Sequence, residues 1–111
     1  MTENIPKGTE KKIMELQLLE QNLQNSLMQK QRFQTELLET ENALKEVAST
    51  KEAYKIVGNI MVASKKEDLK KELSEKKKII DLRMKTLEKE ESQLKEKTNN
   101  LQKQVIGEMK K

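Results

Sequence analysis

One short stretch, residues 54–63, sets the strongest limit on how this chain can fold. It reads Tyr-Lys-Ile-Val-Gly-Asn-Ile-Met-Val-Ala, whereas the sequence on either side has the composition and periodicity of helices. Tyr, Ile and Val favour strands, and a Gly-Asn pair between two such runs suits a two-residue turn in which Gly adopts a positive φ. We therefore predict a β-hairpin that turns at Gly58 and Asn59.

The sequences that flank this stretch carry matching heptad repeats. The repeats consist of Leu16, Leu23, Lys30, Leu37 and Leu44 before the hairpin, and of Leu73, Ile80, Leu87, Leu94 and Leu101 after it. If the chain folds back at the hairpin, the numbers of facing residues add up to 117, as they do for Leu44 and Leu73. Val57 and Ile60, which flank the turn, give the same sum. Since sustained heptads predict a coiled coil, the fold-back yields an antiparallel two-helix coiled coil joined by one central β-hairpin.

The predicted fold class is mainly α, with a single domain over residues 1–111. Aromatic residues at 2% and hydrophobic residues at 33% leave too little apolar surface for a globular core. We expect the first helix over residues 10–49, although its start can lie anywhere from Ile5 to Glu10. The hairpin segment is expected over 50–63 and the second helix over 64–107. Ser64 and Glu67 have the spacing of a capping box at the start of the second helix, and Gly107 is predicted to end it.

Several classes of function are disfavoured by composition. The chain has no Cys and no His, which argues against disulfides, against thiolate or imidazole metal sites and against catalysis by a nucleophile–histidine pair. Carboxylates on exposed helices lack a cleft that would make them acid–base groups, so we expect neither an enzyme nor a cofactor. The sequence shows no signal peptide and no stretch near the roughly 20 apolar residues that cross a bilayer. We therefore expect a soluble, cytoplasmic protein without a membrane partner.

Lys30 interrupts the apolar seam at the position opposite Leu87. The favoured interpretation is that its aliphatic stem covers the seam while the ammonium group reaches water. The alternative is a register device, because one polar residue in a core can exclude slipped pairings.

The lysine run 76–78 resembles a nucleic-acid contact, but acidic residues stand on both sides of it. No continuous basic stripe can form there, and stacking aromatic residues are missing. We interpret the run as a solvated helix face and expect no nucleic-acid partner.

The predicted hairpin has two largely apolar faces. Alternation puts Lys55, Val57, Ile60 and Val62 on one face and Tyr54, Ile56, Met61 and Ala63 on the other. A lone two-stranded hairpin is marginally stable and leaves unpaired edges, which hairpins from several subunits remove by closing into an intersubunit β-barrel. The alternative is a bare hairpin that serves only as a helix–helix turn. The predicted oligomerisation residues are Tyr54, Ile56, Val57, Gly58, Asn59, Ile60, Met61 and Val62.

Together these features resemble a β-class prefoldin subunit. The resemblance rests on two helices of similar length around a hairpin of the form Tyr-Lys-x-x-Gly-Asn-Ile-x-Val, on an Ile-Pro start, and on the Leu/Gln-rich run over residues 15–24. The single hairpin favours the β class, because α-class subunits carry two. The resemblance implies an ATP-independent chaperone of two α and four β chains, whose hairpins form a double β-barrel platform. It also implies that the coiled coils hold unfolded proteins for delivery to a group II chaperonin.

Apolar residues off the seam near both chain ends are candidates for binding such unfolded clients. Met14, Leu18, Ile106 and Met109 have no partner within a two-helix seam, and flexible Met side chains suit varied partners. The alternative is that they are ordinary surface residues or contact neighbouring chains. The full predicted client-binding set is Ile5, Ile13, Met14, Leu18, Leu19, Leu101, Val105, Ile106 and Met109.

Two other function classes stay open at this point. A structural tether or adaptor would use the same coiled coil to bind one helical partner without general client binding. A nucleic-acid-binding helical hairpin would use the basic second helix. Chemically unrelated unfolded proteins separate a chaperone from a tether, because a tether should ignore them.

Overall fold

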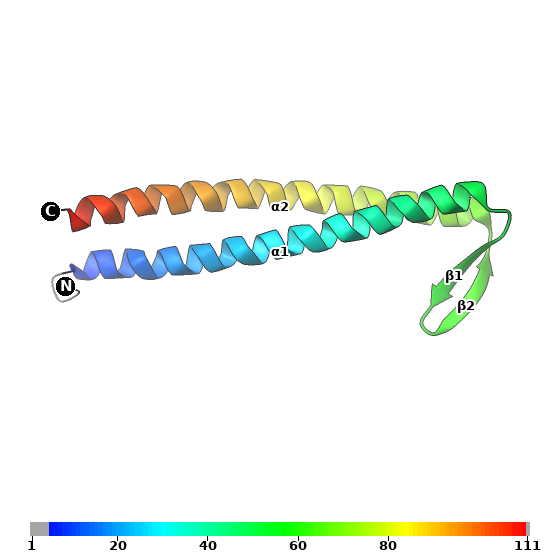
Figure 1. Cartoon of the computed structure of the whole chain (residues 1–111), viewed down its shortest axis with the longest axis horizontal. Helices are drawn as coiled ribbons and strands as arrows, with labels where there is room; N and C mark the ends of the chain where they lie inside the picture. Colours follow the sequence, from blue (N-terminus) through cyan, green and yellow to red (C-terminus); the bar gives the residue numbers. More distant parts are fainter. Residues whose placement is uncertain (1–4, 111) are drawn as a thin grey trace. The chain divides into compact units, whose positions relative to one another are not determined.

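The structure, a computed structural model, describes residues 5–110. It contains α1 (Lys7–Ser49), β1 (Ala53–Val57), β2 (Ile60–Ser64) and α2 (Lys66–Met109) in this order (Figure 1). The predicted mainly helical fold, with two long helices around one hairpin, is therefore confirmed. Residues 1–4 and 111 of the predicted domain lie outside the described residues. Neither helix within residues 5–110 carries a segment apolar enough to cross a membrane.

The chain divides into two compact units. Residues 1–30 together with 86–111 form the first, which we call the end unit, and residues 31–85 form the second, the hairpin unit. Each unit contains part of α1 and part of α2.

In the end unit, polar contacts link the first turns of α1 to the last turns of α2. The Thr9 hydroxyl donates a hydrogen bond of 2.6 Å to Oε2 of Glu108, and the Lys12 ammonium pairs with Oε1 of the same carboxylate. The numbers of Thr9 and Glu108 again add up to 117, so the fold-back register extends a full heptad beyond the leucines. Thr9 and Val105 are buried in this seam. The ends of the two helices are therefore tied together.

The end of α2 differs from the prediction. Gly107 was expected to end the helix, yet α2 continues to Met109. A glycine costs about 1 kcal/mol relative to alanine in a helix interior. The buried Val105 side chain and the bound Glu108 carboxylate, one on each side of Gly107, offset this cost. The start of α1 at Lys7 falls within the expected range from Ile5 to Glu10, because the Pro6 carbonyl accepts the first helical hydrogen bond, from the Glu10 amide at 3.0 Å.

In the hairpin unit, β1 and β2 form a two-stranded antiparallel sheet with the predicted register. Tyr54 pairs with Ala63, and Val57 pairs with Ile60. Gly58 occupies the first position of the turn with φ of 61°, a left-handed conformation that glycine adopts without steric cost. The Gly-Asn turn is therefore confirmed.

The junction between β2 and α2 corrects the predicted capping box. Ser64 is the last residue of β2, and its hydroxyl donates to the carbonyl of Lys65 at 3.5 Å. The same carbonyl accepts the first helical hydrogen bond, from the Leu69 amide at 3.0 Å, so Lys65 and not Ser64 is the N-cap residue. The strand holds Ser64 in the sheet, one residue too early to cap the helix. Glu67 and Asp68 in the first turn still favour the helix dipole.

Two lysines attach the base of the hairpin to the helices. Lys66 at the start of α2 donates to the Ala48 carbonyl of α1 at 3.0 Å, and Lys55 of β1 pairs with Glu72 of α2 at 3.2 Å. The last turn of α1 contains no basic residue of its own. Lys66 therefore supplies the positive charge that stabilises the open carbonyl end of this helix.

Candidate functional site

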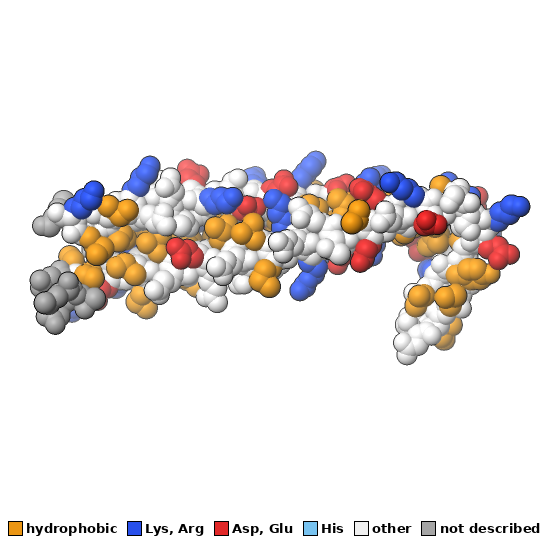
Figure 2. Space-filling model, in the orientation of Figure 1, with side chains coloured by type: hydrophobic (Ala, Val, Ile, Leu, Met, Phe, Trp, Pro, Cys, Tyr) orange, Lys and Arg blue, Asp and Glu red, His pale blue; other side chains and the backbone are white. Residues whose placement is uncertain are grey.

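One face of the hairpin exposes its apolar side chains. Tyr54 is 53% exposed, and the cross-strand pair Ile56 and Met61 is 71% and 66% exposed. We call these three residues the open hairpin face. Hydrophobic side chains are visible over the hairpin in the space-filling view (Figure 2). Exposed aromatic, aliphatic and Met side chains of this kind are enriched at protein–protein contacts.

The opposite hairpin face is partly covered at its base. Ala53 is buried, Lys55 is half-buried and paired with Glu72, and Val62 is 38% exposed. Val57 and Ile60 next to the turn are exposed. The predicted alternation of two faces is present, but the face that carries Lys55 lies against α2 at its base. The open hairpin face therefore has more apolar surface left for a partner.

The end unit exposes a second set of apolar side chains. Met14, Leu18, Ile106 and Met109, which the sequence singled out, are 68%, 58%, 54% and 57% exposed. The other predicted client-binding residues differ in burial: Ile5, Ile13, Leu19 and Leu101 are half-buried, and Val105 is buried. Val105 belongs to the seam between α1 and α2, so the four exposed residues offer the apolar surface for contact with a partner.

A hollow of about 370 Å³ brings together three of the predicted residues. Leu18 and Leu19 of α1 and Leu101 of α2 form its apolar part. Glu15, Lys97, Asn100 and Gln104 complete its lining. A hollow of this size and apolar character accommodates an aliphatic side chain with polar groups beside it.

A second hollow of about 300 Å³ was not anticipated from the sequence. Its lining shares Lys97 with the first hollow and also includes Asn22, Asn25, Ser26, Gln29, Glu90, Gln93 and Leu94. Half of these lining residues carry side-chain amides. The signal that would have found this hollow is the spacing of three and four residues at positions 22, 25 and 29 of α1 and at positions 90, 93 and 97 of α2, which places these side chains on one face of each helix.

Lys30 is held by carboxylates of α2. Its ammonium lies 3.4 Å from Oε2 of Glu91 and 3.9 Å from Oε1 of Glu88, and its side chain is 25% exposed. Glu91 also pairs with Lys95 at 2.9 Å. The hydrogen bond from Lys95, together with the charge of Lys30, lowers the pKa of the Glu91 carboxyl below its ordinary value of 4.5, although burial acts against this. The Lys30 ammonium therefore forms ion pairs with carboxylates of α2, and its side chain is also partly exposed to water.

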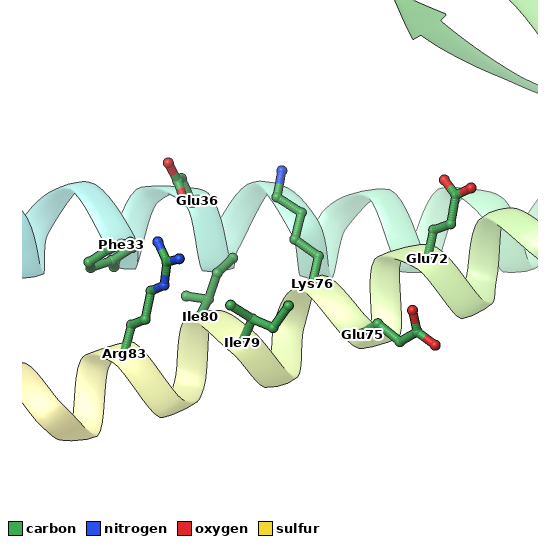
Figure 3. A pocket seen from close by; sticks show the side chains of 8 residues that line it. All are labelled: Phe33, Glu36, Glu72, Glu75, Lys76, Ile79, Ile80 and Arg83. Atoms are coloured by element: carbon green, nitrogen blue, oxygen red, sulfur yellow. The ribbon is translucent and has the colours of Figure 1, made fainter.

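A further hollow, of about 340 Å³, lies in the hairpin unit (Figure 3). Arg83 of α2 extends toward Phe33 of α1, with its guanidinium carbon 5.9 Å from the ring centroid. Ile79 and Ile80 also line this hollow. The guanidinium over the ring adds a cation–π contact that stabilises the pairing of the two helices. Within residues 5–110, no group of three or more acidic side chains is arranged to bind a metal ion.

Comparison with known proteins supports one family. The sequence model described as "Prefoldin subunit" matches residues 10–111. Prefoldin subunit beta of Sulfurisphaera tokodaii is 37% identical over 108 residues, which cover 95% of this chain and 86% of the relative. Prefoldin subunit beta of Archaeoglobus fulgidus is 56% identical over 43 residues, or 39% of this chain and 37% of that relative.

A solved structure extends this similarity to three dimensions. The crystal structure of the prefoldin beta subunit from Thermococcus strain KS-1 superposes with a TM-score of 0.84 at 35% identity, and 92% of each chain is covered. The helix–hairpin–helix order and the sequence similarity over nearly the whole chain point to the same conclusion. The chain therefore belongs to the prefoldin family, as a β-class subunit of a chaperone that assembles from several subunits.

Proposed function

We propose that this chain holds unfolded polypeptides in an ATP-independent chaperone and delivers them to a group II chaperonin. The complex contains two α-class chains and four copies of a β-class chain such as this one. The hairpins join the subunits in a β-barrel, and the end units carry the surface that binds clients. The observation that carries the proposal is the pair of separate apolar surfaces, one on the hairpin and one in the end unit.

The end-unit surface has the properties that a holding surface needs. Four apolar side chains, Met14, Leu18, Ile106 and Met109, are more than half exposed near the chain ends of α1 and α2. Unbranched Met side chains adapt to different partners. Each apolar side chain contributes only about 1.5 to 3 kcal/mol when it is fully buried. The binding free energy of a client is therefore distributed over several residues and several subunits. Because each contact is weak, the client can be released.

The test compares two variants of the chain. One replaces the exposed apolar side chains of the end unit by serine, and the other replaces similar side chains elsewhere. Met14→Ser, Leu18→Ser, Ile106→Ser and Met109→Ser are combined in the full chain, which is then assembled with α-class subunits. The matched control combines Leu38→Ser, Ile79→Ser and Leu82→Ser of the hairpin unit, whose side chains are 58%, 53% and 67% exposed. Both sets remove exposed side chains of similar size and exposure.

Suppression of aggregation is measured with several chemically unrelated unfolded proteins. We expect the end-unit variant to lose most of its protective effect and the control to keep it, while both assemble. A truncated chain that starts at Glu20 and ends at Thr98 should behave like the end-unit variant. Equal protection by the end-unit variant and the unchanged protein would contradict the proposed holding surface. Protection of no unfolded protein by the unchanged complex would favour a structural tether.

A further inference from the structure

We propose that the two adjoining hollows of the end unit form one groove that binds a client segment in extended conformation, chiefly through the main chain of the client. We call it the amide groove. The inference rests on the proposed holding function and adds how the client is recognised. One end of the groove receives aliphatic side chains, and the other end exchanges hydrogen bonds with peptide groups.

The rims of the amide groove follow one side of the helix pair. Its lining residues occur at positions 15, 18, 22, 25 and 29 of α1 and at positions 90, 93, 97, 100 and 104 of α2. A spacing that alternates between three and four residues keeps side chains on one face of a helix. The half-buried residues Leu19, Leu94 and Leu101 and the buried residue Ser26 lie between these rows. Both hollows include Lys97, so the two linings are continuous.

Most rim side chains are dipolar amides, and the net charge of the rims is small. Six of the ten rim residues are amides: Asn22, Asn25, Gln29, Gln93, Asn100 and Gln104. Each amide side chain offers two N–H donors and a carbonyl acceptor. The charged rim residues are Glu15, Glu90 and Lys97, so the net charge of the rims is small and negative. This distribution complements an uncharged chain of peptide dipoles and disfavours nucleic acid, whose phosphates would meet two carboxylates.

The amides also favour an extended segment over a helix. A partner that covers the rim removes the amides from water, and each donor or acceptor left without a hydrogen bond then costs about 1 to 3 kcal/mol. A docked helix has already used its own main-chain groups and cannot supply these bonds. An extended segment presents free N–H and C=O groups at each residue, as in the addition of a strand to a sheet edge. The groove thus favours unfolded chains over folded ones, largely independently of the amino-acid sequence of the client.

The groove length sets the size of the bound segment. Fourteen residues separate the first and last rim positions of each helix, which corresponds to about 21 Å at 1.5 Å per residue. An extended chain rises about 3.3 Å per residue, so the groove holds about six residues. The apolar part, with Leu18, Leu19 and Leu101, receives one or two aliphatic side chains of this segment.

The experiment compares two labelled peptides that differ only in their main chain. One is a fluorescein-labelled octapeptide of alternating Leu and Ser. The other has the same sequence, with an N-methyl group at every second residue that removes a main-chain donor. Both are titrated by fluorescence anisotropy against the full chain assembled with α-class subunits. We expect the unmethylated peptide to bind at least tenfold more tightly.

A groove variant tests whether the amides cause this preference. Asn22→Leu, Asn25→Leu and Gln93→Met keep the side chains of similar size. The two Asn→Leu changes raise helix propensity and Gln93→Met leaves it about the same, so the fold is retained. In this variant we expect the unmethylated peptide to bind less than threefold more tightly than the methylated one. Gln17→Met, Gln24→Met and Gln102→Met, at exposed positions outside both hollows, serve as the matched control and should keep the full preference.

Several outcomes would overturn the inference. Equal binding of the two peptides by the unchanged complex would exclude main-chain recognition, and so would an unaltered preference in the groove variant. Tighter binding of a stapled helical peptide than of the extended one would identify a helical partner as the occupant. If the complex still suppresses aggregation in these cases, the amide groove fails while the proposed function stands. If the complex neither binds the peptides nor suppresses aggregation, both fail.

Discussion

Removing the open hairpin face should separate the subunits without unfolding the helices. The perturbation is Ile56→Ser combined with Met61→Ser, a cross-strand pair whose side chains are 71% and 66% exposed. Full burial of such a side chain contributes about 1.5 to 3 kcal/mol. Since about two-thirds of each is available to a partner, assembly gains about 1 to 2 kcal/mol per side chain, or about 2 to 4 kcal/mol per hairpin.

This loss translates into a measurable change in the subunit dissociation constant. Because 1.4 kcal/mol corresponds to a factor of ten, the constant should rise between about 30-fold and several hundred-fold. Sedimentation velocity over a concentration series measures it, and circular dichroism checks that the helical signal persists. Leu38→Ser with Ile79→Ser, which removes comparably exposed side chains of α1 and α2, is the control and should leave the constant unchanged. A change of less than threefold in the hairpin variant would refute assembly through this face.

Three further outcomes are expected. Val57→Asp with Ile60→Asp should dissociate the complex while preserving helix, because burying unpaired charge costs several kcal/mol; an unchanged mass in native mass spectrometry would oppose this. Leu23→Cys with Leu94→Cys should crosslink within one chain on oxidation, as seen by gel mobility, and crosslinks only between chains would contradict the fold-back. Glu91→Gln should weaken the dependence of thermal stability on acid pH: the lowered pKa of Glu91 means that its stabilisation is present above its ordinary pKa of 4.5 and is lost as pH falls through the lower folded value. The melting temperatures of both proteins are measured from pH 6 to pH 3. An equal fall in melting temperature for the two proteins would exclude this contribution.

The main features of the fold were predictable because local chemistry and periodicity agree. The Gly-Asn pair specifies one turn, and the heptads on both sides have the same fold-back register as the strands. Two predicted details, the N-cap at Ser64 and the helix end at Gly107, were wrong because tertiary contacts outweigh the local sequence signals there. Strand pairing holds Ser64 one residue before the helix start, and contacts on both sides of Gly107 extend the last helix past a residue of low propensity.

The candidate surfaces were predictable only in part. Exposed apolar residues such as Met14 and Ile106 stand out in a charged sequence. The amides around Asn22 and Gln93 do not stand out, because Asn and Gln at polar heptad positions look like an ordinary solvated face. Their common groove appears only when the two helices lie together. Similarly, the carboxylates that pair with Lys30 come from the other helix, about 60 residues later in the sequence.

Native mass spectrometry of the assembled complex, before and after addition of an unfolded protein, tests the proposed function most directly. The chain is mixed with an α-class prefoldin subunit, and the number of copies follows from its mass of 13.0 kDa. We expect a particle of six chains, with four copies of this one, that gains the mass of an unfolded client and not that of the same protein when folded. A stable complex that never acquires a client, or the absence of any six-chain particle, would contradict it.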